Sequence, residues 1–525
     1  MAAYKPLLFS SNCAGDGAVM ADFLRVYGFL LQEDEGIAQG VAREDARGVA
    51  RDGAGGEPAV GVPRLTVSWA PAFTAVTLAW TDAGVVWTRR EEAKPAAFRE
   101  TEENRRRRVL RLAFHRLLEN EPDLASLLET LPSPWGILTG VRPTKMMQRF
   151  VDQGLGETEI DAVLDRDFGL EQSRRRLLAQ VSRAQGPFLP AVGEGRKSVS
   201  LYLAYPFCPS RCSYCSFPGY EARRWQKWQA PYLGALEKEI RETGKAAAAM
   251  GFRVETLYFG GGTPTCMDVS AMERILTALQ ENFPLAPGLE WTVEGGRPET
   301  LTPAMLDVLA AHPVTRLCIN PQSMDQRTLD RIGRRHPVQE TEAAFDRVRE
   351  AMAKAGGRAW RINCDLILGL PGETPADTRI SLARVLALRP DNVTLHALAI
   401  KRGSAYKDEK ENLPARAAGL AMVDGTRAIL TEAGYTPYYL YRQKDSLAGG
   451  ENVGYTLPGG TCLYNILMIE ERQTILGLGA GAGSKFLHPG DWSLDNVYNP
   501  KDMIQYIERI DAQIARKVDK LAALG

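Results

Sequence analysis

The feature that most constrains the fold is a regular alternation of strands and helices that begins near residue 197. The predicted strands are the short apolar runs Ser198–Tyr205, Val254–Phe259, Leu289–Val293, Val314–Ile319, Ile362–Leu368 and Val393–Leu398. Segments with helix-start signals follow them. Six strand–helix units in succession predict an α/β fold in which parallel strands form a full or partial barrel.

Three of the intervening helices carry start signals. Thr302-Pro303 and Thr374-Pro375 each place a capping hydroxyl before a proline at the first helical position. Ser270 and Glu273 have the spacing of a capping box, in which each side chain satisfies a backbone amide of the first turn. We therefore expect helices to begin at these three points.

Residues suited to binding and catalysis gather where the predicted strands end. In chain order they are Cys208, Cys212 and Cys215, then Gly260–Pro264, Glu294, Asn320–Gln322, Asp365 with Gly369–Glu373, and Ala397–Ala399. The carboxyl ends of parallel barrel strands share one face, and active sites form on that face. The strand pattern alone therefore predicts a single site.

The cysteines Cys208, Cys212 and Cys215 have the restrictive spacing C-x3-C-x2-C. Thiolates spaced in this way on one loop can converge on a single inorganic centre. A structural zinc ion requires a fourth ligand, and no candidate lies nearby in the sequence. Three cysteines suit a four-iron cluster with one open iron that can bind a substrate or cofactor. A zinc knuckle, a disulfide with a spare thiol, and buried structural cysteines are the alternatives.

Composition excludes several classes of protein. The chain has 64 Lys plus Arg and 64 Asp plus Glu, so no global field attracts nucleic acid or an anionic membrane. No apolar stretch is long enough to span a bilayer. The other cysteines are scattered and are expected to be small buried residues; they are Cys13, Cys266, Cys318, Cys364 and Cys462. This usage fits a reducing compartment, so we expect a cytoplasmic protein without nucleic-acid or membrane partners.

The motif also carries a resemblance to a known family. C-x3-C-x2-C with Tyr214 before the last cysteine resembles the radical S-adenosylmethionine (AdoMet) enzymes. The run Tyr202–Cys208 resembles the opening of the oxygen-independent coproporphyrinogen III oxidase family, which includes HemN, HemW and HemZ. The resemblance extends from about Ser198 to about Phe486 and is closest to the HemZ-type members. It implies a partial (β/α)6 barrel with a [4Fe–4S] cluster on the three cysteines and one or two bound AdoMet molecules.

The resemblance also implies which residues contact AdoMet. They are Tyr202, Tyr214, Gly261, Gly262, Thr263, Glu294, Gln322, Arg334, Asp365 and Ala399. Gly261–Thr263 would hold the amino group, Tyr214 would lie by the adenine, and Tyr202 would belong to a second AdoMet site. Taken alone, the three glycines could form only a tight strand–helix connection. Glu294 taken alone could be a solvated loop acid.

The activity implied is the oxygen-independent conversion of coproporphyrinogen III propionates to vinyl groups by a monomeric radical enzyme. The implied partners are a tetrapyrrole substrate and an electron donor such as flavodoxin or ferredoxin. The alternatives are a HemW-like haem carrier and a radical enzyme that acts on another tetrapyrrole. HemW-type proteins usually show a His-Asn-x-x-Tyr-Trp run, and the corresponding stretch here, Glu451–Thr456, lacks both His and Trp. Phe217 stands where HemN-type oxidases often have a further cysteine.

Two C-terminal segments offer further candidates. Aromatic residues beside cations in Pro437–Lys444 would suit a flat tetrapyrrole with carboxylates, and a strand followed by a polar loop is an equal alternative. The cations that could meet propionates are Lys401, Arg402, Arg442 and Lys444, or these are solvated loop charges. Gly477–Gly483 imitates a dinucleotide-binding turn, but no strand–helix unit with a downstream acid surrounds it.

The sequence divides into four predicted segments. They are an N-terminal α/β domain at 1–130, a helical connecting segment at 131–196, the radical AdoMet core at 197–433 and a HemN-like extension at 434–525. The first has expected strands at Pro63–Trp69, Ala75–Trp80 and Gly84–Thr88, a loop at Gly48–Gly61 and a helix at Lys94–Glu119. Arg105–Arg108 could grip phosphate, but acidic neighbours favour a solvated helix face. Pro134–Lys145 resembles a segment particular to HemZ-type proteins, and its role does not follow from the sequence.

Overall fold

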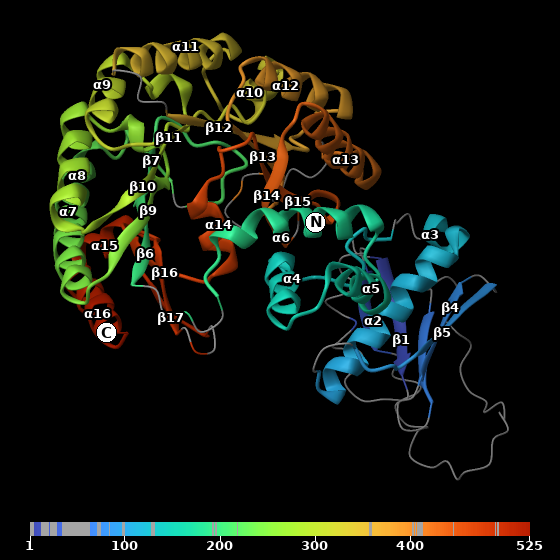
Figure 1. The fold of residues 1–525 in the computed structure, drawn as a ribbon. Helices are drawn as coiled ribbons and strands as arrows, with labels where there is room; N and C mark the ends of the chain where they lie inside the picture. Colours follow the sequence, from blue (N-terminus) through green and yellow to red (C-terminus); the bar gives the residue numbers. More distant parts are fainter. Residues whose placement is uncertain are drawn as a thin grey trace. The chain divides into compact units, whose positions relative to one another are not determined.

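The structure is a computed structural model in which the chain forms two compact units (Figure 1). The N-terminal unit comprises residues 1–141 and 149–179, and the barrel unit comprises residues 142–148 and 180–525. The residues that the structure describes are 5–11, 20, 29–33, 64–70, 75–82, 85–96, 100–127, 132–191, 194, 197–217, 219–355, 360–401, 404, 406, 413–444, 446–488, 490 and 493–524. Cys13, the Gly48–Gly61 segment and Arg402 lie outside them.

The N-terminal unit contains a mixed sheet in the order β2-β1-β3-β4-β5. Its strands are β1 (Lys5–Ser11), β2 (Phe29–Glu33), β3 (Arg64–Trp69), β4 (Ala75–Asp82) and β5 (Val85–Glu92). The long helix α2 (Glu102–Asn120) packs against β4 and β5, and the buried rings of Trp80 and Phe114 lie 6.2 Å apart between them. The shorter helices of this region are α3 (Pro122–Leu127), α4 (Pro143–Asp152), α5 (Glu157–Phe168) and α6 (Gln172–Gln185).

Two expectations for this unit need correction. The helix expected from Lys94 begins only at Glu102, because β5 continues to Glu92 and the Thr101 hydroxyl caps the helix by accepting from the Asn104 N–H at 3.2 Å. The arginine run is not a uniformly solvated face. Arg108 is buried and pairs with Glu100 at 2.8 Å, because its position on α2 faces the sheet side of the helix.

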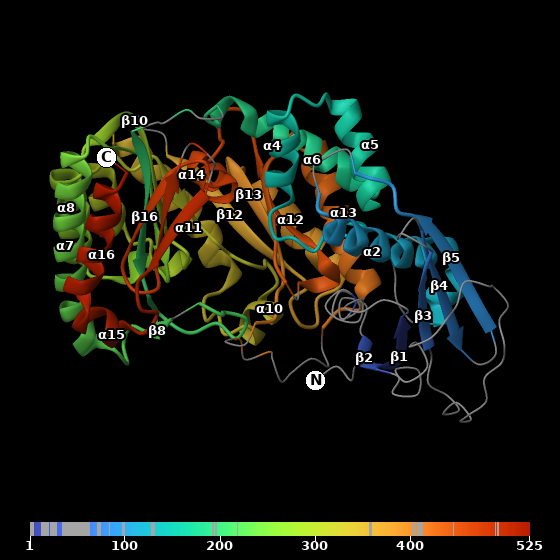
Figure 2. The ribbon, with the colours of Figure 1, turned by 90° about the horizontal axis from the view of Figure 1, so that it is seen from below.

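The barrel unit has the predicted strand order. Its parallel strands are β6 (Ser198–Tyr205), β9 (Arg253–Gly261), β10 (Leu285–Glu294), β11 (Arg316–Cys318), β12 (Arg361–Leu368) and β13 (Asn392–Ala397), neighbours in that order. Their helices are α7 (Gln226–Ala249), α8 (Val269–Asn282), α9 (Pro303–Ala311), α10 (Gln326–Arg331), α11 (Val338–Lys354), α12 (Pro375–Ala387) and α13 (Arg416–Glu432). Figures 1 and 2 show these helices along the outside of the strands. The predicted partial (β/α)6 barrel is confirmed.

The barrel does not close on itself, because further strands extend both of its edges. Beside β6 lie β16 (Thr474–Leu478), β17 (Gly483–His488) and β18 (Ser493–Tyr498); beside β13 lie β15 (Glu451–Thr456) and β14 (Thr436–Arg442). The result is one sheet of 11 strands. A short helix, α14 (Leu463–Glu470), connects β15 with β16, and α15 (Met503–Glu508) and α16 (Ile510–Ala522) end the chain.

Two of the three predicted helix starts are confirmed. Thr302 accepts from the Met305 N–H at 3.3 Å, and Thr374 forms a capping box with Asp377. The capping box predicted at Ser270 is wrong. The residue before α8 is Asp268, which is extended, and its carbonyl already accepts from the Met272 N–H at 3.0 Å. Ser270 consequently lies inside the first turn.

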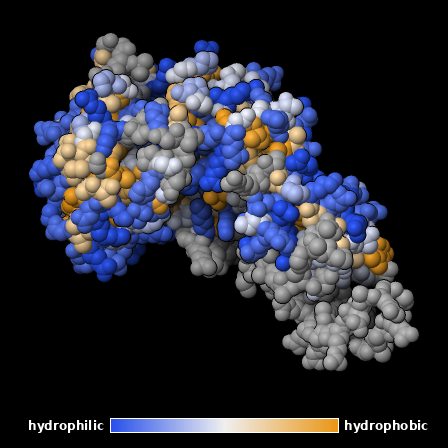
Figure 3. Space-filling view, turned by 60° about the horizontal axis from the view of Figure 1, so that its bottom comes forward, coloured by the Kyte–Doolittle hydropathy of each residue, from blue (hydrophilic) through white to orange (hydrophobic). Residues whose placement is uncertain are grey.

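Among the described helices, none is long and apolar enough to cross a membrane. The described residues on the face in Figure 3 are mostly hydrophilic, and apolar residues form patches between the hydrophilic ones.

Candidate active site

The three cysteines lie on the loop that follows β6. At the base of the loop, β7 (Phe207–Cys208) pairs with β8 (Tyr220–Glu221), and the Ala222 N–H donates to the Cys208 carbonyl oxygen at 2.9 Å. Within the loop, the Ser210 hydroxyl donates to the Gly333 carbonyl oxygen at 3.1 Å. These contacts fix the loop against the barrel.

The cysteine side chains lie close enough to influence one another. Burial raises the pKa of the Cys208 thiol, and the nearby Cys215 and Cys212 raise it further. Two hydrogen-bond donors face the sulfurs. Arg297 Nη2 lies 2.9 Å from Cys212 Sγ, and Thr263 Oγ1 lies 3.5 Å from Cys208 Sγ. Such donors stabilise thiolates, the form of cysteine that binds iron.

The structure argues against a disulfide at the cysteine motif. All seven described cysteines are free thiols, so the structure has no disulfide at the motif. Cys318, Cys364 and Cys462 are buried as expected, whereas Cys266 is half-buried. In the described part of the chain, no three His, Cys, Asp or Glu side chains are placed to hold a single metal ion. A four-iron cluster is a separate case, because each thiolate binds a different iron.

The glycine turn after β9 lies directly against the strand that leads to the cysteines. The Gly262 N–H donates to the Tyr205 carbonyl oxygen at 2.8 Å, and a Cβ at Gly262 would lie 2.6 Å from the carbonyl oxygens of Tyr205 and Phe207. A Cβ at Gly260 would lie 2.8 Å from the carboxyl carbon of Glu294. Only glycine fits at 262, where the clash is with backbone oxygens, and a Cβ at 260 would displace the Glu294 carboxylate. The turn therefore brings the cysteine loop and Glu294 together.

Glu294 is half-buried at the carboxyl end of β10, so it is not a solvated loop acid. Tyr258 donates its hydroxyl to Glu294 Oε1 at 2.6 Å. Burial raises the pKa of Glu294 to about 7; the Tyr258 hydrogen bond opposes this rise, and the nearby Asp365 adds to it. A carboxylate in this environment attracts a cationic ligand group such as an ammonium.

Asp365, on β12, belongs to a polar chain that the sequence reasoning missed. Asn363 donates to Asp365 Oδ1 at 2.9 Å, and His396 Nε2 lies 3.7 Å from Asp365 Oδ2. The other ring nitrogen of His396 lies 3.3 Å from the Tyr441 hydroxyl. Burial raises the pKa of Asp365, but His396 and the neighbouring donors outweigh burial and hold it below its ordinary value. The sequence feature that could have revealed His396 is a single histidine within an otherwise apolar predicted strand.

Gln322 and Arg334 line the neighbouring strand ends. Gln322 has a positive φ of 68°, and its buried Oε1 has no hydrogen-bond partner among the described residues; the same holds for Asn320 Oδ1. Arg334 is buried, and its Nη2 donates to the Tyr214 hydroxyl at 3.1 Å. Buried acceptors are normally satisfied, so these oxygens fit the donor groups of a bound ligand. The close approach at Gly262 and the donors to the cysteine sulfurs fit the predicted cluster and AdoMet.

Two further predicted AdoMet residues are Tyr202 on β6 and Ala399 just after β13. Tyr202 points into a stack of tyrosines, with its ring centroid 6.3 Å from Tyr258 and 6.4 Å from Tyr464. Burial and the charge of Glu294 raise its pKa. Ala399 is half-buried and forms an antiparallel bridge with Ser446 just after β13. All these AdoMet contacts stay predictions.

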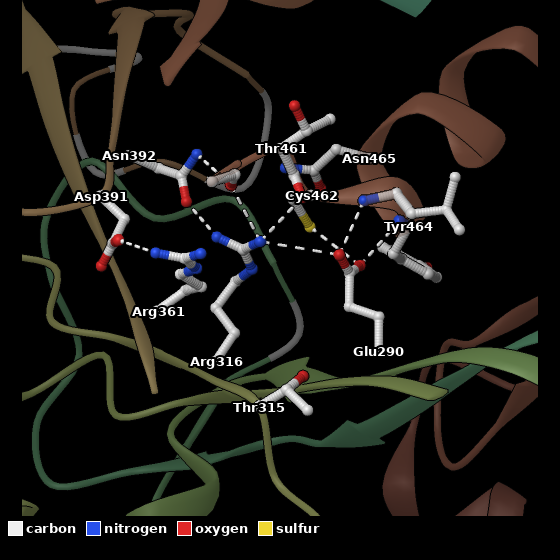
Figure 4. A network of polar contacts seen from close by, with 12 residues as sticks. Glu290, Thr315, Arg316, Arg361, Asp391, Asn392, Thr461, Cys462, Tyr464 and Asn465 are labelled. Carbon is white, nitrogen blue, oxygen red and sulfur yellow. Dashed lines mark hydrogen bonds and ion pairs between the residues drawn. The ribbon is translucent and has the colours of Figure 1, made fainter. Parts of the chain in front are cut away.

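A polar network holds the helix that carries Tyr464 (Figure 4). Glu290 accepts from the Leu463 and Tyr464 N–H groups at 2.8 and 2.9 Å, so it caps the start of α14. Arg316 donates to the Thr461 carbonyl oxygen at 2.9 Å and lies 3.6 Å from Glu290. The Tyr464 ring stacks on Tyr258 at 4.7 Å. The network therefore fixes an aromatic surface beside the carboxylate of Glu294.

Of the cations predicted to meet propionates, three are described. Lys401 and Lys444 are exposed, and burial lowers the pKa of Lys401. Arg442 is half-buried at the end of β14 and donates to the Gly449 carbonyl oxygen at 3.1 Å. The segment Pro437–Lys444 is a strand for most of its length, and its tyrosines Tyr438 and Tyr439 are buried.

The Gly477–Gly483 segment runs from β16 to the start of β17 and contacts α7. The Gly479 N–H donates to the buried Glu239 of α7 at 2.7 Å. Glu239 pairs with the buried Lys517 of α16. The C-terminal helix is thereby tied to the strand next to β6.

The structure gives a role to part of the Pro134–Lys145 segment. Arg142, Lys145 and Lys485 surround the carboxylate of Glu471 at 2.6 to 2.7 Å. Glu471 follows α14 directly and has a left-handed backbone. The segment therefore fixes the end of α14, the helix that carries Tyr464.

Comparison with known proteins identifies the family. Residues 202–384 match the radical SAM superfamily. The chain is 37% identical over 390 residues to the oxygen-independent coproporphyrinogen-III oxidase-like protein HemZ of Bacillus subtilis (strain 168), which covers 74% of this chain and 77% of that protein. The chain belongs to the HemN/HemW/HemZ family. This confirms the family expected from the motif.

Members of the HemN/HemW/HemZ family differ in their described roles. The heme chaperone HemW of Escherichia coli is 27% identical over 292 residues, or 55% of this chain and 71% of that protein. The solved structure of coproporphyrinogen III oxidase (HemN) from Escherichia coli, a radical SAM enzyme, has a TM-score of 0.50 and 26% identity over 63% of this chain and 73% of that one. The family uses a [4Fe–4S] cluster and AdoMet, as expected. Family membership alone does not distinguish oxidase from chaperone.

Proposed function

We propose that this protein is an oxygen-independent coproporphyrinogen III dehydrogenase that converts propionate side chains to vinyl groups. In this proposal, Cys208, Cys212 and Cys215 ligate three irons of the cluster. Gly261–Thr263 and Glu294 position the amino group of AdoMet. When bound, the cluster and AdoMet supply a 5′-deoxyadenosyl radical for removal of a hydrogen atom from a propionate. The substrate radical would then lose carbon dioxide and pass one electron to an external one-electron acceptor, which leaves the vinyl group.

The observation that carries the proposal is the joint position of Glu294, Gly262 and the cysteine loop at one end of the strands. Gly262 bonds to the strand before the loop, and Gly260 lies against Glu294. A ligand held there would be within reach of both the thiolates and a carboxylate suited to an ammonium. This arrangement fits catalysis with AdoMet better than passive storage of a tetrapyrrole.

The chain's own residues can prepare the site for radical chemistry. The stacked rings of Tyr202, Tyr258 and Tyr464 form an aromatic wall beside Glu294, which would help to exclude water from a ligand held there. Exclusion of water limits side reactions of a reactive species. Glu294 is held by Tyr258 and Asp365 by His396, so both carboxylates are oriented before a ligand arrives.

The histidines support an enzyme over a haem carrier. The chain has five histidines. Of these, His396 is the one that belongs to the site residues described above. Both of its ring nitrogens have partners, Asp365 and Tyr441. Glu451 occupies the position at which HemW-type proteins usually have the histidine of their His-Asn-x-x-Tyr-Trp run, and it is 2% exposed. A histidine ligand for haem iron is therefore not presented by these residues.

The test is an anaerobic assay of the reconstituted protein with coproporphyrinogen III, AdoMet and a reductant. The dehydrogenase releases carbon dioxide in step with 5′-deoxyadenosine. A carrier binds haem stoichiometrically and releases no carbon dioxide. An enzyme for another tetrapyrrole cleaves AdoMet slowly without substrate and leaves coproporphyrinogen III unchanged.

A further inference from the structure

The cysteine loop and the turn that follows it carry an excess of positive charge. Residues 205–228 contain four cations and the single acid Glu221, although the whole chain is neutral. The cations are Arg211, Arg223, Arg224 and Lys227, and all four are exposed. Glu221 is half-buried, and the exposed Asp502 also reaches this turn, where it accepts a hydrogen bond from the Tyr220 hydroxyl at 3.3 Å. The local surface therefore attracts anionic groups.

Backbone contacts place these cations beside the cysteines. Arg211 lies inside the motif, between Cys208 and Cys212. The Ala222 N–H donates to the Cys208 carbonyl oxygen, so Arg223 follows a residue that touches the first cysteine. Arg211 and Arg223 consequently lie close to the cysteines along the backbone.

An exposed aromatic ring lies in the same loop. The Phe217 side chain is 63% exposed and lies two residues after Cys215. Single exposed apolar side chains are common on protein surfaces. This one differs because it stands two residues from one of the three cysteines, on the same loop as the exposed Arg211. It offers a short connection from the surface to the centre held by the cysteines.

We propose that Arg211, Phe217, Arg223, Arg224 and Lys227 form a docking face, the cysteine-loop face, for a small acidic protein that carries one electron. The inference rests on the proposed function in one respect, that the centre on the three cysteines must be reduced from outside. In the step itself the carrier gives up one electron to that centre; no bond forms or breaks, and no proton moves.

The features of the face match those of transient electron-transfer contacts. Such contacts are small, and charge complementarity speeds their formation. Opposite charges around an apolar centre raise association rates at low salt and release the partner quickly. A nucleic-acid ligand is disfavoured, because the chain has no net positive charge and the patch has one exposed ring.

The experiment compares two electron donors with the anaerobically reconstituted full-length protein. One is a reduced acidic flavodoxin, and the other is reduced methyl viologen, a small cation. The readout is 5′-deoxyadenosine released without tetrapyrrole, so the result does not depend on the substrate proposed above. A binding titration with oxidised flavodoxin provides a second readout that does not require turnover.

The variant is Arg223→Glu with Arg224→Glu, and the matched control is Arg241→Glu with Lys245→Glu. The control charges are exposed on α7, where Arg241 lies roughly 20 Å along the helix from its start. With flavodoxin, we expect the rate of the Arg223/Arg224 variant to fall about tenfold and its dissociation constant to rise about tenfold. Its rate with methyl viologen and both rates of the control should stay at the wild-type level.

Three results would overturn the proposal. The first is a flavodoxin-driven rate equal to that of the wild type. The second is an equal loss with methyl viologen, because the arginines would then act on the site itself. The third is binding of an RNA or DNA oligonucleotide that the variant abolishes while flavodoxin binding persists. Added salt should slow the flavodoxin-driven rate of the wild type and leave the methyl viologen rate unchanged.

Discussion

The guanidinium of Arg297 donates a hydrogen bond of 2.9 Å to the sulfur of Cys212, the buried member of the three cysteines. Arg297 is 3% exposed and also donates to the Ser210 carbonyl oxygen at 2.8 Å. A fixed positive charge thus lies against the centre that the cysteines hold. Positive charge and hydrogen bonds at the ligand sulfurs stabilise the reduced form of an iron–sulfur cluster.

Replacement of Arg297 by Met should therefore lower the reduction potential of the cluster. A charge-assisted hydrogen bond contributes roughly 1.5–3 kcal/mol, which corresponds to a shift of roughly 65–130 mV for one electron. A redox titration followed by electron paramagnetic resonance measures it. An unchanged potential in a variant that keeps its iron would show that this contact does not tune the cluster.

The three cysteines of the motif should be the only protein ligands of the cluster. Ala at Cys208, Cys212 or Cys215 should abolish the charge-transfer absorbance of the anaerobically reconstituted protein. Cys266 is the matched control, because it is half-buried nearby and bonds to the Phe207 carbonyl oxygen at 3.5 Å. If Cys266→Ala lost the absorbance equally, the assignment of ligands would be wrong.

Glu294→Gln should weaken AdoMet binding and leave the iron content unchanged. Loss of a charge-assisted hydrogen bond of roughly 1.5–3 kcal/mol corresponds to roughly tenfold to a hundredfold in affinity. Burial holds the pKa of Glu294 at about 7, so its carboxylate is mostly protonated below that pH. Wild-type affinity should consequently rise as the pH increases through about 7, and the variant should lack this rise.

A calorimetric titration of AdoMet across this pH range measures both effects. The exposed Glu281 supplies the control variant Glu281→Gln, which should bind as the wild type does. Equal affinity of Glu294→Gln and wild type at pH 8 would remove Glu294 from the binding site.

Because cations surround Glu471, the free energy of unfolding should depend on pH in the acidic range. Burial acts to raise its pKa, but hydrogen bonds from Lys145 and Lys485 and the charge of Arg142 lower it to about 2, against an ordinary value of 4.5. The native state therefore gains stability from this ionised group above pH 4.5, and that gain is lost as the pH falls toward 2. Glu471→Gln should destabilise the neutral-pH protein by about 2 kcal/mol.

Denaturant unfolding at pH 7 and at pH 3 measures this contribution. The difference in unfolding free energy between Glu471→Gln and the wild type should be smaller at pH 3, because the wild-type carboxylate contributes less stability there. A difference that is constant with pH would mean that packing, and not charge, accounts for the destabilisation.

Much of the barrel could be predicted because its signals are local. Ser198–Tyr205 is an uninterrupted strand pattern, and the structure places β6 on the same residues. Thr302 and Thr374 precede prolines, so their capping roles depend only on neighbouring residues. Ser270 misled because Asp268, two residues earlier, also suits the start of a helix.

The parts that could not be predicted depend on contacts between distant residues. Lys145 meets Glu471 across 326 positions, so the sequence around Lys145 gives no sign of its partner. His396 gains meaning only when β12 places Asp365 beside it. The AdoMet contacts came from the family resemblance, and the structure adds their surroundings: a tyrosine stack at Tyr202 and a buried, unpaired oxygen at Gln322 within the described residues.

The most direct measurement of the central claim uses coproporphyrinogen III that carries deuterium on the propionate carbons next to the ring. The reconstituted protein is incubated anaerobically with this substrate and AdoMet, and the 5′-deoxyadenosine is analysed by mass spectrometry. A dehydrogenase that uses its radical on the propionate transfers one deuterium to each 5′-deoxyadenosine and releases carbon dioxide in equal amount. Unlabelled 5′-deoxyadenosine with no carbon dioxide would contradict the claim.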